Sequence, residues 1–141
     1  MNIKIKSSRG DYGVAEFDSS KFFLKKKNNN FFYIIDKNVY KKNKYIKKIK
    51  KNLIIINANE NTKDYDNISQ IIKKLLNYGI KRNATLVGVG GGVVQDTTAF
   101  IASIIFRGIK WNFIPTTLLA QCDSCIGGKT SINFKKTKNQ L

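Results

Sequence analysis

The stretch Leu86–Asp96, Leu-Val-Gly-Val-Gly-Gly-Gly-Val-Val-Gln-Asp, decides the fold of this chain. Its apolar start predicts a short buried strand, its glycines a tight turn, and the residues from Val93 onward the beginning of a helix. A helix that begins behind a glycine turn presents bare backbone N–H groups and the positive end of its dipole. Because glycine has no Cβ, a phosphate can approach this backbone closely. The stretch therefore predicts an anion site.

Strand and helix patterns alternate on both sides of this stretch. Four apolar runs predict buried strands, at 31–36, 53–56, 84–89 and 111–114. Apolar residues at helical spacing predict three helices, at 39–49, 65–76 and 93–106. In the first helix these residues are Val39, Ile46 and Ile49, and in the second they run from Tyr65 to Leu76, with Tyr65 expected in the core. This order is typical of an α/β fold, a Rossmann-like parallel sheet with flanking helices.

The domain organisation follows from the same patterns. Residues 2–24 alternate apolar and polar side chains around Gly10 and Gly13, which predicts a small strand pair. We expect residues 1–30 to belong to the same domain as an α/β unit over residues 31–141. Ligands of parallel sheets bind at the carboxyl ends of the strands. Here we expect them at Asp36, 57–63, 88–96 and 115–129.

The charge of the chain is unusual. Its 141 residues hold 26 basic and 9 acidic side chains, a net charge of +17. Of the basic residues 23 are Lys and 3 are Arg, whereas proteins that read nucleic acids rely on Arg. Sixteen Asn accompany the Lys, which indicates compositional drift. We expect no specific nucleic-acid binding, only weak association that salt abolishes; a basic nucleic-acid-binding module is the alternative from another class.

Cysteine content and hydropathy exclude several further classes. Cys122 and Cys125 stand alone without His or a second Cys pair, so they predict no zinc site. No apolar run approaches the ~20 residues that span a membrane, and the start lacks a signal-peptide core. We therefore expect a cytoplasmic chain with no membrane partner.

A second cluster runs from Pro115 through Thr116-Thr117-Leu118-Leu119 to Gly127-Gly128-Lys129-Thr130. Its end is similar to the phosphate loop of triphosphatases, but Asp123 stands where that loop begins with Gly. ATP or GTP hydrolysis is therefore excluded. The first cluster is also not the ordinary dinucleotide fingerprint, because Val93 stands where that fingerprint has its last glycine.

The order and spacing of these motifs resemble the dehydroquinate synthase family of NAD-dependent sugar-phosphate cyclases. The matching stretches are Gly90–Asp96, Phe106–Gly108, Pro115–Ala120, Asp123–Thr130 with Asn133, and Lys138-Asn139. The similarity is dense from 84 to 141. From 31 to 83 it is mainly strand order and Glu60-x-x-Lys63, and before 31 it is faint.

The resemblance implies a set of binding residues for NAD and substrate. Residues at the pyrophosphate would be Gly91, Gly92 and Val93, and those at the nicotinamide half Asp96, Thr116, Thr117 and Leu119. Residues on the adenosine side would be Glu60 and Lys63 with Asp36. Asp123, Ser124 and Lys129 would bridge cofactor and substrate. Lys138 would contact both ligands, and Asn139 would contact the substrate. Arg107 would reach the substrate phosphate in a neighbouring subunit, which implies a homodimer.

The implied reaction converts 3-deoxy-arabino-heptulosonate 7-phosphate, a phosphorylated keto sugar acid, into 3-dehydroquinate with loss of phosphate. This is a step of chorismate and aromatic amino acid biosynthesis. The family's divalent metal, zinc or cobalt, binds one Glu and two His of a helical C-terminal domain that is absent from this chain, which has no His. We expect an N-terminal, cofactor-binding part of a truncated sequence, without metal ligands or identifiable catalytic residues, and inactive alone.

Some residues depart from the family pattern. Asn59 replaces a common Gly, Gln95 and Thr97-Thr98 replace a Gly and Leu-Ala, and Cys125 replaces a Ser. Aminocyclitol-forming cyclases, which share the scaffold, are therefore one alternative. Glycerol dehydrogenase-like oxidoreductases, which share the glycine turn and the Pro-Thr-Thr segment, are another. The segment Gly127–Thr130 favours dehydroquinate synthase over the cyclases, and together with Arg107 it argues against the dehydrogenase. A requirement for substrate phosphate would separate the cyclases from the dehydrogenase.

Overall fold

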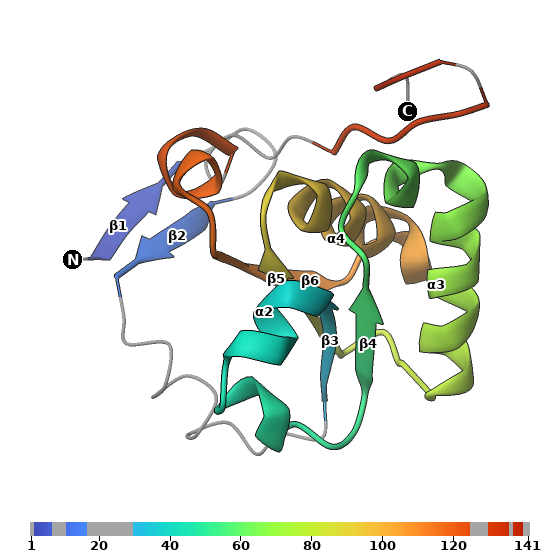
Figure 1. Cartoon of the computed structure of the whole chain (residues 1–141), viewed down its shortest axis with the longest axis horizontal. Coiled ribbons are helices and arrows are strands. Elements are labelled where there is room, and N and C mark those ends of the chain that lie inside the picture. The colour runs from blue at the N-terminus through green and yellow to red at the C-terminus, as the bar shows by residue number, and fades with distance from the viewer. Residues whose placement is uncertain (1, 7–10, 17–29, 125–129, 136, 140–141) are drawn as a thin grey trace.

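A four-stranded parallel sheet forms the centre of the computed structural model, which describes residues 2–6, 11–16, 30–124, 130–135 and 137–139. Its strands are β3 (Phe31–Asp36), β4 (Leu53–Ile56), β5 (Thr85–Gly90) and β6 (Lys110–Pro115), in the order β4-β3-β5-β6. The register pairs Ile35 with Ile55 and with Val89, and Gly90 with Pro115. The predicted α/β fold is confirmed, and all four strands end at one edge (Figure 1).

Helices cover both faces of this sheet (Figure 1). The helices are α2 (Lys37–Lys42), α3 (Tyr65–Asn77) and α4 (Gly92–Ile104), with short turns η1 (Ile46–Lys48), η2 (Glu60–Lys63), η3 (Ile105–Arg107) and the π-helical η4 (Ala120–Ser124). On one face, Ile68 of α3 and Ile101 of α4 pack with Ile34. On the other face, Ile46 of η1 packs with Ile35 and Val89. Side chains therefore alternate between two cores along each central strand.

The N-terminal strand pair is confirmed in the part of residues 2–24 that the structure describes. β1 (Asn2–Ile5) and β2 (Tyr12–Ala15) form their own antiparallel sheet, with Ile3 opposite Val14. Gly10, one of the residues on which that prediction rested, lies outside the described residues. The assignment of residues 1–30 to the same domain as 31–141 stays a prediction.

The helix predicted over 39–49 is wrong as one helix. The Asn43 N–H closes α2 on the Val39 carbonyl, and Asn43 itself is extended. Its side-chain oxygen then accepts from the N–H groups of Tyr45 and Ile46, at 2.9 and 3.2 Å. Side-chain capping by Asn thus competes with helix continuation. Val39 and Ile46 still pack on the same core, which explains their spacing.

Two further helix predictions need correction. In α3 the buried residues are Ile68, Ile71 and Leu75, whereas Tyr65 is 43% and Leu76 51% exposed, because they lie at the margins of the apolar stripe. The helix predicted to run to residue 106 ends at Ile104. Phe106 and Arg107 adopt left-handed backbone conformations, with φ of 51° and 64°, so the chain turns away there.

Candidate functional site

Gly88 and Gly90 allow helix α4 to lie close against strand β5. A Cβ on Gly88 would lie 2.5 Å from the Thr98 hydroxyl oxygen, and one on Gly90 would lie 2.9 Å from the Val94 Cβ. These two glycines therefore serve tight packing of helix on strand. By allowing this packing, Gly88 and Gly90 position the turn at Gly91 and Gly92.

Gly91, Gly92 and Val93 are the part of the cluster that faces outward, since all three are partly exposed while Val94 is buried. Gly91 is the N-cap of α4, in an extended conformation, and no side chain caps this end. The Gln95 N–H makes the first bond of the helix, to the Gly91 carbonyl. The N-terminus of a 13-residue helix is thus presented at the carboxyl edge of the sheet, where its partial positive charge favours an anion.

The segment after β6 lies beside this turn. The Thr116 N–H donates to the Gly90 carbonyl at 2.8 Å, and a Cβ on Gly91 would lie 3.2 Å from the Thr117 Cγ2. The Thr117 hydroxyl oxygen accepts from the Ala120 N–H at 3.2 Å, so it also caps its own turn. The structure brings Thr116 and Thr117 to the glycine turn, as predicted.

Leu118 and Leu119 are the most exposed large apolar side chains of this segment, at 77% and 73%. Asp123 is exposed on η4. Two predicted site residues cannot be placed: Lys129 lies outside the described residues, and so does the side chain of Ser124.

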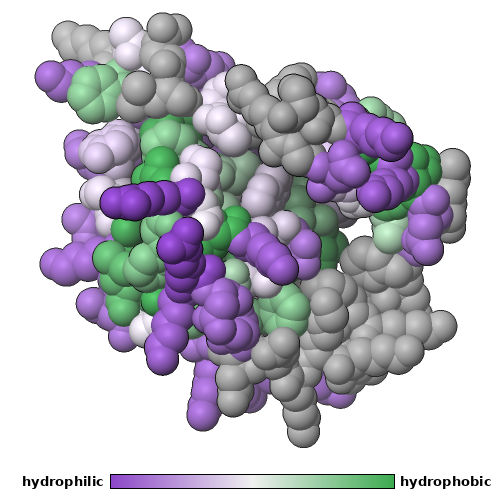
Figure 2. Space-filling view, turned by 180° about the vertical axis from the view of Figure 1, so that it is seen from behind, coloured by the Kyte–Doolittle hydropathy of each residue, from purple (hydrophilic) through white to green (hydrophobic). Residues whose placement is uncertain are grey.

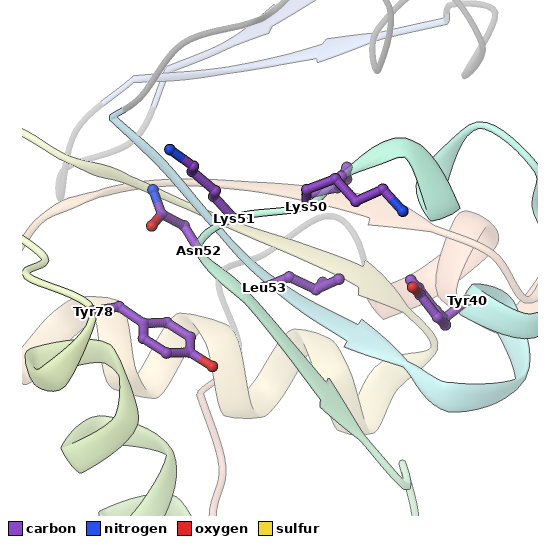
Figure 3. Close-up of a pocket in the computed structure, with 7 residues that line it drawn as sticks. Tyr40, Lys50, Lys51, Asn52, Leu53 and Tyr78 are labelled. Carbon is purple, nitrogen blue, oxygen red and sulfur yellow. The ribbon is translucent and has the colours of Figure 1, made fainter.

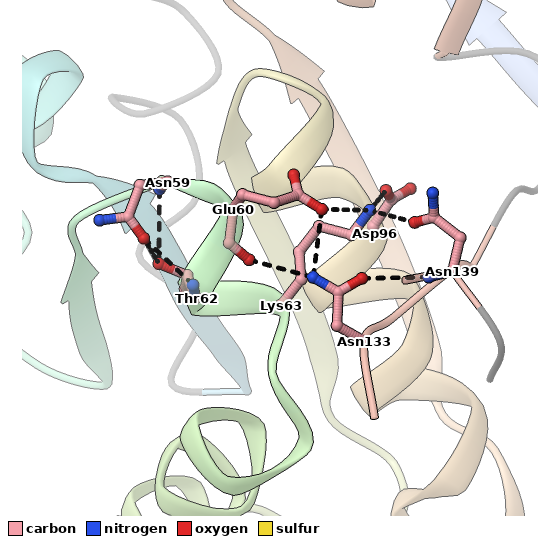
Figure 4. A network of polar contacts seen from close by, with 7 residues as sticks. All are labelled: Asn59, Glu60, Thr62, Lys63, Asp96, Asn133 and Asn139. Atoms are coloured by element: carbon pink, nitrogen blue, oxygen red, sulfur yellow. Dashed lines mark hydrogen bonds and ion pairs between the residues drawn. The ribbon is translucent and has the colours of Figure 1, made fainter. Parts of the chain in front are cut away.

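Lys63 holds a buried ammonium group between three segments of the chain (Figure 4). Its Nζ lies 3.0 Å from an Asp96 carboxylate oxygen of α4, 3.7 Å from Glu60 Oε1, and donates to Asn139 Oδ1 at 2.7 Å. A buried charge is tolerated where opposite charges and hydrogen bonds compensate it. The predicted residues Glu60, Lys63, Asp96 and Asn139 thus form one cluster.

Asn59 explains the local shape of η2, which carries Glu60 and Lys63. Its side-chain oxygen accepts from the Thr62 N–H at 3.1 Å, and its own N–H donates to the Thr62 hydroxyl at 3.4 Å (Figure 4). This is a capping box, and it needs a polar side chain at position 59. The departure from glycine at this position therefore has a structural reason.

Asp36 lies at the end of β3 against the glycine turn, where its Cβ is 3.4 Å from the position of a Cβ on Gly90. One carboxylate oxygen accepts from the N–H groups of Asn38 and Val39, at 2.7 and 3.1 Å. Asp36 therefore caps helix α2 as well as lying at the site.

Arg107 is the predicted site residue that the structure separates from the others. It is exposed on η3, which follows the C-terminal end of α4, whereas the glycine turn precedes the helix. A helix of 13 residues is about 20 Å long. Arg107 and the glycine turn therefore do not act on one small group within a single copy of the chain.

Asn133 is a residue for which no separate role was predicted. Its side chain is 4% exposed and bonds both Glu60 and the backbone of Asn139. Its position in the matching stretch after Thr130 was the one sign of a role in the sequence. That role could not be read from the sequence, because Glu60 lies 73 residues away along the chain.

A separate open hollow lies beside the amino end of β4 (Figure 3). Its lining includes Tyr40, Lys50, Lys51 and Tyr78. Two solvated lysines and two tyrosines form no set of converging buried polar groups, so we do not place the site here. We place the candidate site at the carboxyl edge of the sheet, which has the uncapped N-terminus of α4 and the buried Lys63 ammonium.

Three observations bear on other kinds of site. Hydrophilic residues are spread over the face seen in Figure 2 and do not gather into one stripe. Within the described ranges, no group of three or more His, Cys, Asp and Glu side chains could hold a metal ion. No helix in the same ranges is long and apolar enough to cross a membrane.

The fold and the edge site define a class, the Rossmann-like α/β domains with a glycine turn at the N-terminus of a helix. Residues 53–141 match the family model described as 3-dehydroquinate synthase N-terminal, and the chain belongs to this family. The resemblance seen in the sequence is therefore confirmed.

Relatives agree with this assignment. The chain is 50% identical over 88 residues to a 3-dehydroquinate synthase of Buchnera aphidicola, covering 62% of this chain and 25% of that protein. It is 45% identical over 108 residues to the 3-dehydroquinate synthase of Picrophilus torridus, covering 77% of this chain and 31% of that protein. The chain thus spans between a quarter and a third of the length of these curated relatives.

Solved structures with a similar fold are sugar-phosphate cyclases. A 2-epi-5-epi-valiolone synthase from Streptomyces hygroscopicus with NAD⁺ and Zn²⁺ bound has a TM-score of 0.71 and 28% identity, over 79% of this chain and 34% of that one. A 2-deoxy-scyllo-inosose synthase complexed with carbaglucose-6-phosphate, NAD⁺ and Co²⁺ has a TM-score of 0.82 and 21% identity, over 100% and 42% of the two chains. The latter supports the fold alone.

Proposed function

We propose that this chain forms the NAD-binding part of a 3-dehydroquinate synthase, a lyase that converts 3-deoxy-arabino-heptulosonate 7-phosphate into 3-dehydroquinate with loss of phosphate. The observation that carries the proposal is the uncapped N-terminus of α4 behind Gly91. It lies at the carboxyl edge of a parallel sheet in a chain of this family. The role in chorismate biosynthesis and a cytoplasmic location are parts of the same proposal.

The residues at the glycine turn fit the diphosphate of NAD. Gly91, Gly92 and Val93 are accessible and would offer backbone N–H groups to it, as helix N-termini do for phosphates. When bound, NAD supplies a group that accepts and returns a hydride. Further residues would contact the cofactor: Asp36, Glu60, Lys63, Asp96, Thr116, Thr117, Leu119, Asp123, Ser124, Lys129 and Lys138.

The substrate side is assigned to a smaller set. Asp123, Lys129, Lys138 and Asn139 would bind the phosphorylated keto sugar acid in the same copy of the chain. Arg107, at the far end of α4, would serve the site of a second copy, so the functional form is proposed to be a homodimer. Cations suit this role because they attract both carboxylate and phosphate groups of the substrate.

The described residues do not fit a catalytic metal. The chain has no His, and its described Asp, Glu and Cys residues form no cluster of three. We propose that zinc or cobalt binds to another part of the enzyme, so no step through a metal is assigned to these residues. Purified 141-residue chain should therefore bind NAD but show no turnover with added metal, and measured turnover would contradict this.

The test of NAD binding is isothermal titration of the chain with NAD, compared with the Gly91→Ala variant. The atom nearest to a Cβ at this position is the Thr117 Cγ2, at 3.2 Å, a contact that a small shift relieves, and φ is −93°, so the variant should fold. The added methyl group narrows the approach to the helix N-terminus and should weaken NAD binding by about tenfold or more.

Gly13→Ala on β2 is the matched control, since its Cβ would meet only the Ile3 carbonyl oxygen, at 3.8 Å. Its NAD affinity should equal that of the unmodified chain. A folded chain without NAD affinity, or a Gly91→Ala variant that binds normally, would refute the proposed cofactor site.

A second candidate is a cyclase that forms another carbocycle, favoured by the similarity to the valiolone synthase structure. Phosphate release by an enzyme that contains these residues would separate the two. Release from the 3-deoxy-heptulosonate phosphate supports the first function, and release from a different sugar phosphate but not from this one supports the second. A glycerol dehydrogenase-like activity would instead need no substrate phosphate.

A further inference from the structure

Asn133 connects segments that meet at the candidate site from distant parts of the sequence. Its side-chain Nδ2 donates to the Glu60 carbonyl oxygen at 3.3 Å and to Glu60 Oε1 at 3.1 Å. Its Oδ1 accepts from the Asn139 N–H at 3.0 Å. Figure 4 shows Asn133 between these two residues, next to Lys63.

The backbone of Asn133 is held as firmly as its side chain. Its N–H donates to the Lys63 carbonyl at 2.9 Å, and its carbonyl accepts from the Tyr65 N–H at 3.0 Å. An isolated parallel bridge joins Asp64 to Asn133. The side chain therefore has a fixed origin from which to orient Glu60 and Asn139, both of which contact the Lys63 ammonium.

Position 133 requires a side chain that donates on one side and accepts on the other. An Asp of the same shape would keep the acceptor for Asn139 but lose both donors to Glu60. It would also place a second carboxylate about 3 Å from that of Glu60, where like charges disfavour each other. The amide is thus matched to a neighbouring carboxylate.

We propose that Asn133 is a positioning residue that sets the Glu60 carboxylate and Asn139 around the Lys63 ammonium, and so joins the cofactor side of the site to the substrate side. This inference rests on the proposed function for the roles of Glu60, Lys63 and Asn139. Asn133 itself touches neither ligand in this assignment; it acts through the residues that do.

The experiment measures NAD affinity of the chain by titration and the ¹⁵N signal of the Lys63 ammonium by NMR. Asn133→Asp should weaken NAD binding roughly tenfold, because buried groups lose their partners. It should also broaden the Lys63 signal. In Asn133→Asp combined with Glu60→Gln, the Gln amide can donate to the Asp carboxylate, so the Lys63 signal should recover relative to Asn133→Asp; NAD affinity is not compared in this double variant, because Glu60 is itself assigned to the cofactor.

Asn52→Asp is the matched control. Asn52 donates from Nδ2 to the Phe31 carbonyl at 3.3 Å, near the amino end of the sheet. Its substitution also removes an amide donor, but it should leave NAD affinity and the Lys63 signal unchanged. Asn133→Ser, which removes the amide without adding charge, is measured in parallel and carries the test should Asn133→Asp fail to fold.

The two proposals can fail separately. If the unmodified chain is folded but does not bind NAD, the proposed function is wrong, and the Lys63 signal alone decides the role of Asn133. If the Lys63 signal of the position-133 variants equals that of the unmodified chain, or the double variant shows no recovery, the positioning role is refuted.

Discussion

Gly90 occupies a position where α4 leaves no room for a side chain. A Cβ there would lie 2.9 Å from the Val94 Cβ, which is fixed to the helix backbone. Gly90→Ala should therefore push α4 away from β5 and lower the free energy of unfolding by about 1–3 kcal/mol. Urea unfolding measures this loss.

Gly91→Ala is the comparison for that prediction, because the atom nearest to its Cβ is the Thr117 Cγ2 at 3.2 Å, a less severe contact than the one at Gly90. It should change the unfolding free energy by less than about 0.5 kcal/mol. Equal losses in the two variants would show that the packing of α4 on β5 is looser than described.

Tyr33 links the stability of the chain to alkaline pH. Burial raises the pKa of its phenol above the ordinary 10.0, since the charged form is disfavoured in the core. The unfolded chain then releases this proton at lower pH than the folded chain. The contribution is full below about pH 10 and is lost as the pH rises through the raised pKa.

Tyr33→Phe keeps the ring but removes the titration. Between pH 8 and 11, the unmodified chain should lose more unfolding free energy than this variant, as followed by urea unfolding at each pH. All other side chains are the same in both proteins, so the difference between the two pH curves reports Tyr33. Parallel pH curves for the two would contradict the prediction.

At the scale of elements, Asn43 converts one amphipathic pattern into two short helices. Its side-chain oxygen caps the turn that leads into η1, by accepting from the backbone N–H groups of Tyr45 and Ile46. Asn43→Ala should remove this cap and lower the unfolding free energy by about 1 kcal/mol, as thermal and urea unfolding would show.

Asn43→Asp keeps the accepting oxygen and should retain most of that stability. If the Asp variant is as destabilised as the Ala variant, the cap is not the cause. The spacing of Val39, Ile46 and Ile49 predicted their apolar packing correctly. It did not predict the break in the helix, because a hydrogen bond from the backbone to an Asn side chain competes with the helical backbone bonds.

For helix α4, at the glycine turn, the start was predicted to within one residue but the end was not. Its beginning was predicted at Val93 and lies at Gly92, because the glycine pattern itself defines a helix start. Its end was misplaced because Phe106 continues the apolar pattern although its backbone is left-handed. Backbone conformation at a single residue is set there by the turn into β6.

At the scale of the whole molecule, the net charge of +17 predicts behaviour toward nucleic acids. The chain should bind DNA of any sequence at low salt and lose that affinity steeply as salt rises, since the binding releases counterions. NAD binding should change little over the same range. Fluorescence titrations with two unrelated duplexes between 20 and 300 mM salt, a range chosen around the Debye screening regime of roughly 0.1 M, would test this.

Sequence-selective binding that survives at the upper salt concentration would favour the nucleic-acid-binding alternative. Phe31 and Tyr33 are buried and do not support that alternative, whereas Tyr65 is 43% exposed and packs edge-to-face against Phe134. Tyr65 was expected in the core, so the structure corrects that expectation, and the salt dependence decides between the two readings.

The α/β fold, the glycine turn and the family could be predicted from the sequence, because apolar periodicity, glycine spacing and motif order are local properties of the chain. The assembly of the site could not, because it depends on contacts between distant segments. Lys63, Asp96, Asn133 and Asn139 meet since parallel strands deliver distant segments to one edge. The same holds for the separate roles of the glycines. Whether a glycine allows close packing or faces outward depends on the atoms that surround it in the folded chain.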